Sequence, residues 1–340
     1  MGKDTVRVAY AAYAKNDNLR MTSSSGAVFS LIAEHILCNQ GVVYGVALTS
    51  DCRTAEFCRV EDSVALAKIR GSKYLQAHIG DTLRLVKDDL CCGKKVLFSG
   101  TGCQINGLKA FLGKEYDNLI CVDLICHGVP SPALWRKYIV HKEVEFGSRV
   151  MNVNFRSKKQ NWEDFGTEFN NEKIKEVYIS KDKDAYMQMF LRDYCLRPSC
   201  YACKARNLRF ADITLADFWR IDSIVPEMND GKGSSLVLVR TPKGQSIFEQ
   251  IKEEMVIKEV TYEDGVKGNS AEYQSPLRPT ERETFYVDMK MLGFDALERK
   301  YAAQQPVPIR RRLKKIIKKI GTLILPQRHG SVKKVMKTTS

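Results

Sequence analysis

Apolar runs and helical periodicities alternate along the first 150 residues of the chain. The runs rich in β-branched residues predict strands, at 5–17, 41–48, 56–60, 94–99 and 118–126. The segments TSSSGAVFSLIAEHIL, EDSVALAKI and GDTLRLVKDDLCCG have the spacing of helices. In the first of these, Val28, Ile32 and Ile36 share one face, and Ser24 or Ser25 is the expected N-cap. The alternation predicts an α/β fold, a mixed sheet with flanking helices, whose working loops follow the carboxyl ends of strands.

The pattern changes after about residue 150. Strands are predicted within 151–169, at 175–179, in ADITLADFW and in GSSLVLVRTPKG, with a cluster of cysteines among them. We therefore divide the chain into residues 1–90, residues 91–270, a connecting segment over 271–305, and a tail over 306–340.

The tail carries most of the excess charge. The chain has a net charge of +14, but eleven lysines and arginines and no acidic residue lie between Tyr301 and Ser340. Only +3 is left for residues 1–300, so the charge of the whole chain is no argument for nucleic-acid binding.

Within the tail, the segment IRRRLKKIIKKIGTLIL predicts a basic amphipathic helix. Ile309, Leu313 and Ile320 fall on one face, and cationic residues fill the rest. We expect residues 306–340 to attach the protein peripherally to the anionic inner face of a membrane. Nucleic acid is the less favoured partner, because the segment lacks interleaved aromatic residues.

The rest of the chain indicates a cytoplasmic protein. The N-terminal segment has charges inside and after its short apolar run, unlike the uninterrupted core of a signal peptide. No stretch approaches the roughly 18 apolar residues of a transmembrane helix. In a reducing compartment, clustered cysteines serve as metal ligands or redox groups more often than as disulfides.

Four cysteines stand out by their positions. Cys103 in SGTGCQ and Cys126 in DLICHG each follow a predicted strand, while Cys200 and Cys203 form a C-x-x-C pair. Loops that follow neighbouring strands converge, so the four thiolates suit either a tetrahedral zinc site or an iron–sulfur cluster. One pair plus two scattered cysteines favours a cluster, although spacing does not separate the two metals and buried or redox thiols are a third interpretation. The remaining cysteines outside this region are interpreted as core or surface thiols: Cys38, Cys52, Cys58, Cys91, Cys92 and Cys121.

The segments FSGTGCQINGLKAFL, NLICVDLICHGVPSP, RPSCYACK and ADITLADFW resemble the signatures of the coenzyme F420 hydrogenase/dehydrogenase beta-subunit family. That family includes archaeal F420-reducing subunits, plant 7-hydroxymethyl chlorophyll a reductase and many bacterial members encoded among polysaccharide genes. The resemblance runs from about residue 8 to 265. It implies a flavoprotein that binds FAD in its N-terminal part and a [4Fe-4S] cluster in its C-terminal part. By position, the implied cluster ligands are Cys103, Cys126, Cys200 and Cys203, with Cys195 as a spare thiol or an alternative ligand.

The resemblance also implies where the flavin binds. Serine and glycine before a helix suit a phosphate, and a cation beside the N1/C2=O edge would stabilise the anionic reduced ring. The plainer interpretations are a capped helix, a surface turn with two solvated cations, and an aspartate that caps a turn. The implied flavin contacts are Ser24, Ser25, Gly26, Arg70, Ser72, Lys73, Tyr74, Gln76, Asp217 and Ser235, with Ser234 as an alternative to the last.

The chain departs from the family pattern at several positions. Gly102 replaces a proline in GTGCQ, Ala27 replaces a glycine in SSGA, and in ADFWR both Ala216 and Arg220 replace glycines. These changes alter backbone freedom or bulk, but they remove no implied ligand. The chain also begins directly at the flavin part, without the ferredoxin module of many bacterial relatives. We therefore expect a separate ferredoxin-like electron donor.

The leading hypothesis is an oxidoreductase dependent on FAD and a [4Fe-4S] cluster, in which the cluster passes electrons singly and the flavin pairs them. Its substrate would be an organic molecule, in polysaccharide or cell-envelope biosynthesis. Lys204, Arg206 and Arg209 would offset the charge of the cluster and dock an acidic ferredoxin, unless they are a solvated charge run. The alternative is a non-catalytic four-cysteine zinc module whose basic tail binds a membrane or nucleic acid.

Three other residues keep two interpretations each. We expect His127 to brace its loop rather than to carry protons. Arg156 and Trp162 either line a substrate groove or cover the sheet. No GxGxxG fingerprint is present, so NAD(P) is disfavoured as a direct partner.

Overall fold

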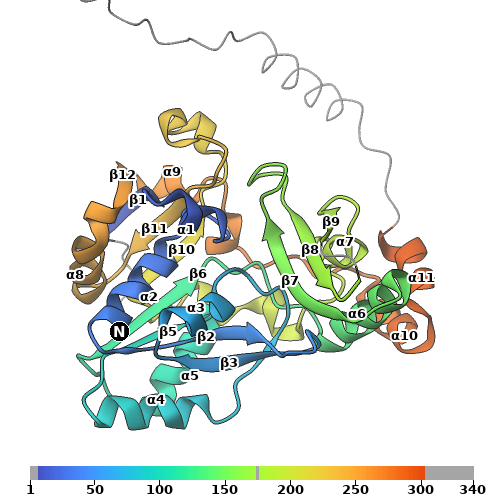
Figure 1. Cartoon of the computed structure of the whole chain (residues 1–340), viewed down its shortest axis with the longest axis horizontal. Coiled ribbons are helices and arrows are strands. Elements are labelled where there is room, and N and C mark those ends of the chain that lie inside the picture. Colours follow the sequence, from blue (N-terminus) through green and yellow to red (C-terminus); the bar gives the residue numbers. More distant parts are fainter. Residues whose placement is uncertain (1–6, 174–175, 303–340) are drawn as a thin grey trace, which may run out of the picture. The chain divides into compact units, whose positions relative to one another are not determined.

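A computed structural model describes residues 7–173 and 176–302 of the chain. Within these residues the strands form two sheets (Figure 1). The larger sheet has nine strands in the order β12-β1-β11-β10-β6-β5-β2-β3-β4, and the smaller has three in the order β7-β8-β9. The strands are β1 (Val8–Ala14), β2 (Val42–Leu48), β3 (Ala55–Val60), β4 (Ala77–His78), β5 (Val96–Ser99), β6 (Leu119–Leu124), β7 (Val150–Ser157), β8 (Gly166–Asn171), β9 (Val177–Ser180), β10 (Ile213–Asp217), β11 (Ser235–Val239) and β12 (Met255–Val260).

Helices connect the strands of the larger sheet and cover it. The α-helices are α1 (Asp17–Met21), α2 (Val28–Cys38), α3 (Ser63–Ile69), α4 (Thr82–Cys91), α5 (Gly102–Leu112), α6 (Pro132–Phe146), α7 (Ala185–Leu191), α8 (Pro242–Ile251), α9 (Tyr262–Val266), α10 (Arg282–Met291) and α11 (Phe294–Leu297). In the described residues, none of them is both long and apolar enough to span a bilayer.

The middle of the larger sheet is parallel. Neighbouring strands β10, β6, β5 and β2 run in the same direction, whereas β12, β1 and β11 continue the sheet by antiparallel pairing. All five residues of β11 are buried, as expected of a strand covered on both faces. The carboxyl ends of β5 and β6 therefore meet at one edge, where their loops can share a site.

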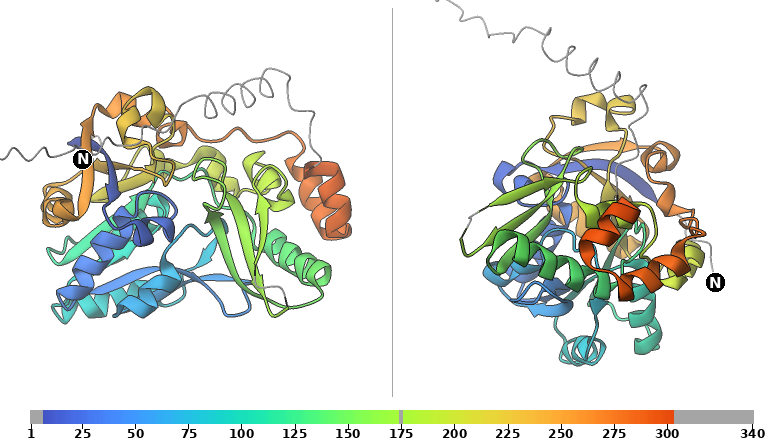
Figure 2. Two further views of the ribbon diagram at one scale, coloured as in Figure 1. Left: turned by 45° about the horizontal axis from the view of Figure 1, so that its top comes forward. Right: turned by 90° about the vertical axis from the view of Figure 1, so that its right-hand side faces the viewer.

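The smaller sheet packs with α6, α7, α10 and α11 around an aromatic core. Its centre includes Trp135, Tyr138, Phe155, Phe169 and Tyr186, all nearly inaccessible to solvent. Figure 2 shows the green strands of this sheet beside α6, with the orange and red helices α10 and α11 close by. Such rings bury large apolar areas. Ala55 of β3 belongs to the same cluster and Leu48 of β2 packs against it, so this second core also covers the end of the larger sheet.

The predicted α/β fold, with a mixed sheet and flanking helices, is confirmed. Strand β2, from residues 1–90, lies in the larger sheet next to β5 and β6, which come from residues 91–270. The division of the chain at residue 90 stays a prediction. The connecting segment over 271–305 contains α10 and α11. The predicted tail helix over 306–340 lies outside the described residues.

Two local predictions were wrong. The strand predicted to end at Cys126 ends at Leu124, so Cys126 belongs to the loop that follows. Neither Ser24 nor Ser25 caps α2, because the N-cap residue is Ala27 and it has a left-handed backbone with φ of 68°. The serines are engaged with other segments, which sequence periodicity does not record.

Candidate functional site

Two of the four cysteines follow neighbouring parallel strands. Cys103 lies in the first turn of α5, directly after β5, and Cys126 lies two residues beyond β6. β5 and β6 pair in parallel from Val96 with Leu119 to Ser99 with Val122, so both loops leave the same edge of the sheet. The turn before α5 is fixed because the Thr101 N–H donates to the Gln104 side-chain oxygen at 2.8 Å.

Cys200 lies in a short 3-10 helix, Pro198–Ala202, that is attached to the Cys126 loop, and Cys203 directly follows that helix. The Arg197 N–H donates to the Val129 carbonyl at 3.0 Å, and Pro130 forms a β-bridge with Leu196. The Cys203 N–H donates to the Ser275 hydroxyl at 3.1 Å. The first two contacts hold the segment before Cys200 against the loop that carries Cys126, and the third fixes Cys203 to the segment around Ser275.

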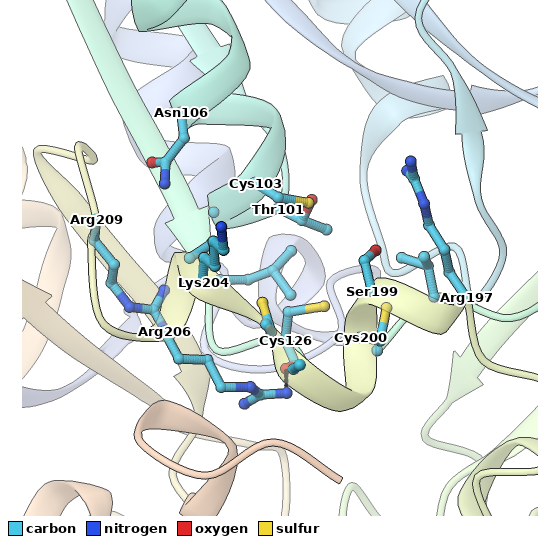
Figure 3. Close-up of a pocket in the computed structure, with 17 residues that line it drawn as sticks. Thr101, Cys103, Asn106, Cys126, Arg197, Ser199, Cys200, Lys204, Arg206 and Arg209 are labelled. Carbon is cyan, nitrogen blue, oxygen red and sulfur yellow. Dashed lines mark hydrogen bonds between the residues drawn. The ribbon is translucent and has the colours of Figure 1, made fainter. Parts of the chain in front are cut away.

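All four cysteines line one pocket with a volume of about 360 Å³. Figure 3 shows the labelled thiols of Cys103, Cys126 and Cys200 around this space. As the side chains lie, no group of three or more His, Cys, Asp or Glu among residues 7–173 and 176–302 could hold a metal ion. The four thiols thus share one cavity.

Burial favours the protonated form of two of the four thiols, those of Cys126 and Cys200. Burial raises the pKa of Cys126 to about 12, and the nearby thiols of Cys200 and Cys103 add to this effect, while Arg206 opposes it. Burial also raises the pKa of Cys200. A cationic metal group would favour the thiolates instead, so binding would release protons.

Cationic side chains surround the pocket, but two of them are not on the surface. Arg206 is 9% exposed and donates to the carbonyls of Cys126 and His127 at 2.7 and 2.9 Å. Arg209 is 8% exposed and forms ion pairs with Asp123 and Glu272. The prediction that Arg206 and Arg209 dock a partner was therefore wrong, because both are buried and engaged.

Lys204, by contrast, is exposed at the rim of the pocket. Cys103 is exposed as well. Arg206 has a further feature: its Nε and Nη1 atoms are buried without a hydrogen-bond partner in the described part of the chain. A buried guanidinium with open donors beside four thiols suits a negatively charged group in the pocket.

Cys195 lies apart from this pocket. It is fully buried in the aromatic core, and its carbonyl accepts hydrogen bonds from the Ser131 N–H and the Tyr286 hydroxyl. Burial raises the pKa of its thiol to about 12. Nothing in this position brings the Cys195 thiol to the pocket lined by the other four cysteines.

The predicted flavin loop 24–26 lies against β11. The Ser25 hydroxyl donates to the Ser234 carbonyl at 2.7 Å, and the Gly26 N–H donates to the Ser235 hydroxyl at 2.9 Å. A Cβ atom on Gly26 would lie 2.3 Å from the Ala12 carbonyl oxygen, so only glycine allows this approach. The structure thus brings Ser25, Gly26 and Ser235 together.

Only some residues of the second predicted flavin segment, 70–76, contact the loop 24–26. The Ser24 hydroxyl accepts from the Ser72 N–H at 2.8 Å, which joins the two segments. The side chains of Arg70 and Lys73 bind other groups. Arg70 donates to the Ser30 hydroxyl and the Glu34 carboxylate. The Lys73 ammonium donates to three backbone carbonyls.

Tyr74 and Asp217 lie on either side of a buried arginine that the sequence left ambiguous. Arg156 donates from Nη2 to Asp217 at 2.6 Å. Burial raises the pKa of Tyr74, and the positive charge of Arg156 acts against that rise. Asp217 also pairs in register with Ser235, so this group adjoins the serine loop. Trp162 is buried and stacks on Trp219 with ring centroids 5.1 Å apart.

Lys158 was missed by the sequence analysis. Its ammonium donates to the carbonyls of Arg20, Ser25 and Lys232 at 2.7, 2.7 and 2.8 Å. It therefore holds the serine loop against the turn before β11. The segment FRSKKQ reads as a surface charge run, and no feature of it signals that this lysine is buried.

The cysteine pocket and the predicted flavin segments are in direct contact. The Gln76 N–H donates to the Pro130 carbonyl at 3.2 Å, four residues beyond Cys126. The Phe190 ring lies 5.3 Å from the Tyr74 ring and 5.3 Å from the His127 ring, centroid to centroid. His127 also pairs with Asp193 at 2.6 Å, which fixes the loop that carries Cys126.

The chain has similarities to known proteins in sequence and in structure. The family model for the C terminus of the coenzyme F420 hydrogenase/dehydrogenase beta subunit matches residues 93–265, just over half of the chain. No curated protein matches the sequence. Among solved structures, the chain is similar to one in the xenon-derivatised F420-reducing [NiFe] hydrogenase complex from Methanosarcina barkeri. The two share 15% identity over 76% of this chain and 83% of that one, with a TM-score of 0.49.

The matched residues 93–265 include all four cysteines of the pocket as well as Arg156, Asp217 and Ser235. The chain therefore belongs to the family defined by the C terminus of the coenzyme F420 hydrogenase/dehydrogenase beta subunit, a family of redox enzyme subunits.

Proposed function

We propose that the protein is an oxidoreductase dependent on FAD and a [4Fe-4S] cluster, with Cys103, Cys126, Cys200 and Cys203 as the cluster ligands. One observation carries the proposal: four thiols from three separate segments line a single pocket, and the wall of that pocket is bonded to the predicted flavin segments. Membership of a family of redox enzyme subunits supports it.

The arrangement of thiols favours a cluster over one zinc ion. Four sulfurs about 2.3 Å from a single zinc ion must lie within about 4 Å of one another. The four thiols come from three segments and surround a cavity of about 360 Å³, which is more room than one ion needs. A cluster takes one thiolate on each of several irons and so suits sulfurs that stand farther apart. The unpaired N–H donors of Arg206 would interact with the negative charge of the cluster.

When bound, the cluster supplies single-electron transfer and the flavin supplies two-electron chemistry. The chain's own residues hold these groups close together. His127, Phe190 and Tyr74 fill the space between the two sites with packed rings. Ser24, Ser25, Gly26, Ser72 and Ser235 form the loop contacts where the flavin would bind.

The electron donor would approach at the cysteine pocket, where Cys103 and Lys204 are exposed. We propose that this donor is a ferredoxin-like protein. An organic substrate in polysaccharide or cell-envelope biosynthesis, and a peripheral position on the inner face of a membrane, are parts of the proposal supported by the sequence alone.

Anaerobic purification tests the proposal directly. We expect about four iron atoms and one FAD per chain, with a broad visible absorption band from the cluster. Cys200→Ser should lose most of the iron, whereas Cys91→Ser, which alters an exposed thiol away from the pocket, should retain it. Zinc in place of iron and flavin would establish the four-cysteine zinc module instead.

A further inference from the structure

Arg156 has a buried donor that the described protein leaves unsatisfied. The side chain follows from the end of β7 and is 3% exposed as a residue. Its Nη2 donates to Asp217, but its Nε has no hydrogen-bond partner among the described residues. A buried donor of a charged group that makes no hydrogen bond destabilises the folded protein, so such donors normally face a ligand or water.

The position of the guanidinium is fixed by its neighbours. Its central carbon lies 3.7 Å from the Phe165 ring centroid and 5.3 Å from that of Trp219. The carboxylate of Asp217 holds one end at 2.6 Å. Stacking and pairing together leave little rotamer freedom, so the open donor points in a defined direction.

The groups around Arg156 come from the segments that approach the serine loop. The charge of Arg156 acts on the pKa of Tyr74, and Asp217 pairs in register with Ser235, whose hydroxyl accepts from Gly26. Two residues along the chain, Lys158 holds the Ser25 carbonyl. The end of β7 and the residue after it thus supply two buried basic side chains to this loop. Burial lowers the pKa of Lys158 to about 7, so Arg156 is the permanent positive charge of the two.

The two cations that the sequence predicted for the flavin, Arg70 and Lys73, have no buried unsatisfied donor in the described part of the chain. Arg70 binds Glu34 and Ser30 on α2. Lys73 donates to the carbonyls of Lys68, Arg70 and Gly71, close to the carboxyl end of α3. Burial also lowers the pKa of Lys73 to about 7, which weakens it as a permanent charge.

We propose that Arg156 is the positioning residue that supplies the positive charge of the flavin site, in place of Arg70 and Lys73. The inference rests on the proposed function, because it assigns Arg156 to the same flavin. An arginine can pair with Asp217 through Nη2 and donate from Nε in another direction, whereas a lysine donates all its hydrogen bonds from one nitrogen. A positive charge next to the ring system favours the reduced, anionic flavin.

The test measures FAD binding and the midpoint potential of the bound flavin in the full chain. Arg156→Gln should weaken FAD binding at least ten-fold and make the potential more negative. Arg156→Lys should restore the potential, because it keeps the charge, but should bind FAD several-fold more weakly than the unmodified chain. Arg53→Gln, which breaks a comparable ion pair with Glu143 away from this site, should change neither quantity.

The outcomes separate this inference from the proposed function. Failure of the unmodified chain to bind FAD would overturn both. If the unmodified chain binds FAD and folded Arg156→Gln binds it equally well with an unchanged potential, only the role of Arg156 is wrong. If Arg156→Gln does not fold, Arg156→Lys decides: FAD affinity equal to that of the unmodified chain overturns the inference. Failure of both variants to fold assigns Arg156 to the core and overturns it too.

Discussion

At the scale of single residues, two positions of this chain have a left-handed backbone conformation, and the family pattern has glycine at both. Ala27 has φ of 68° at the start of α2, and Arg220 has φ of 68° directly after the ADFW segment. A side chain in this region costs roughly 1 kcal/mol relative to glycine. The cost at Ala27 is offset by burial of its methyl group in the core between α2 and the sheet. Arg220 is exposed and gains no such burial.

Arg220→Gly should therefore raise the free energy of unfolding by about 0.5 to 1 kcal/mol. Relief of the left-handed strain outweighs the extra freedom that glycine gives the unfolded chain. Denaturant titration measures the change as a shift of the midpoint at constant slope. The matched variant Arg220→Ala keeps a Cβ atom and should show no gain. An equal gain in both variants would contradict the backbone explanation.

At the scale of elements, one buried carboxylate attaches α4 to the edge of the larger sheet. Asp89 accepts hydrogen bonds from Tyr44 on β2 at 2.5 Å and from Arg59 on β3 at 2.7 and 2.9 Å. Burial by itself would raise the pKa of Asp89, but hydrogen bonds from Arg59 and Tyr44 outweigh it and lower the pKa to about 2. The carboxylate is thus more stable as an anion in the folded protein than in the unfolded chain.

This pKa predicts how stability depends on pH. Since the folded pKa lies below the unfolded value, the stabilisation is complete above about pH 4 and is lost as the pH falls towards 2. Asp89→Asn should lower the free energy of unfolding by about 2 kcal/mol at pH 7. The difference from the unmodified protein should shrink between pH 4 and 2. Asp88→Asn, at the exposed neighbouring position, should have little effect at either pH; a constant difference for Asp89→Asn would refute the linkage.

At the scale of the whole molecule, two cores meet at the candidate site. The larger sheet supplies the cysteine and serine loops, and the smaller sheet with its aromatic core supplies Phe190, Arg156 and Lys158. Changes in the packing of the aromatic core should therefore affect flavin binding as well as stability. Residues 306–340, which carry most of the excess charge, are a separate feature of the sequence.

Deletion of residues 306–340 should abolish association with vesicles that contain anionic lipid. Flotation of the full and truncated proteins with anionic and zwitterionic vesicles measures this. The truncated protein should keep the iron and flavin of the full chain. Ile309→Gln with Leu313→Gln, which retains every positive charge, separates insertion of the apolar face from charge attraction. Unchanged association after the deletion would refute a role for the tail.

The sequence by itself determined the succession of strands and helices along the chain and the four cysteines as candidate metal ligands. Alternation and helical spacing are local, because they record which residues of one element are buried, and this sufficed for β2, α3 and β5. The position of Cys103 and Cys126 after neighbouring strands was also readable, since parallel strands bring their carboxyl ends together.

Only the tertiary structure decided which charged residues face the site. Arg206 and Arg209 read as surface cations but are buried, and Arg70 is held by α2. Arg156 and Lys158 reach Asp217 and Ser25, 61 and 133 residues away in the chain. Such pairings depend on how the elements pack, and periodicity within one element carries no information about the charge that another element brings to it.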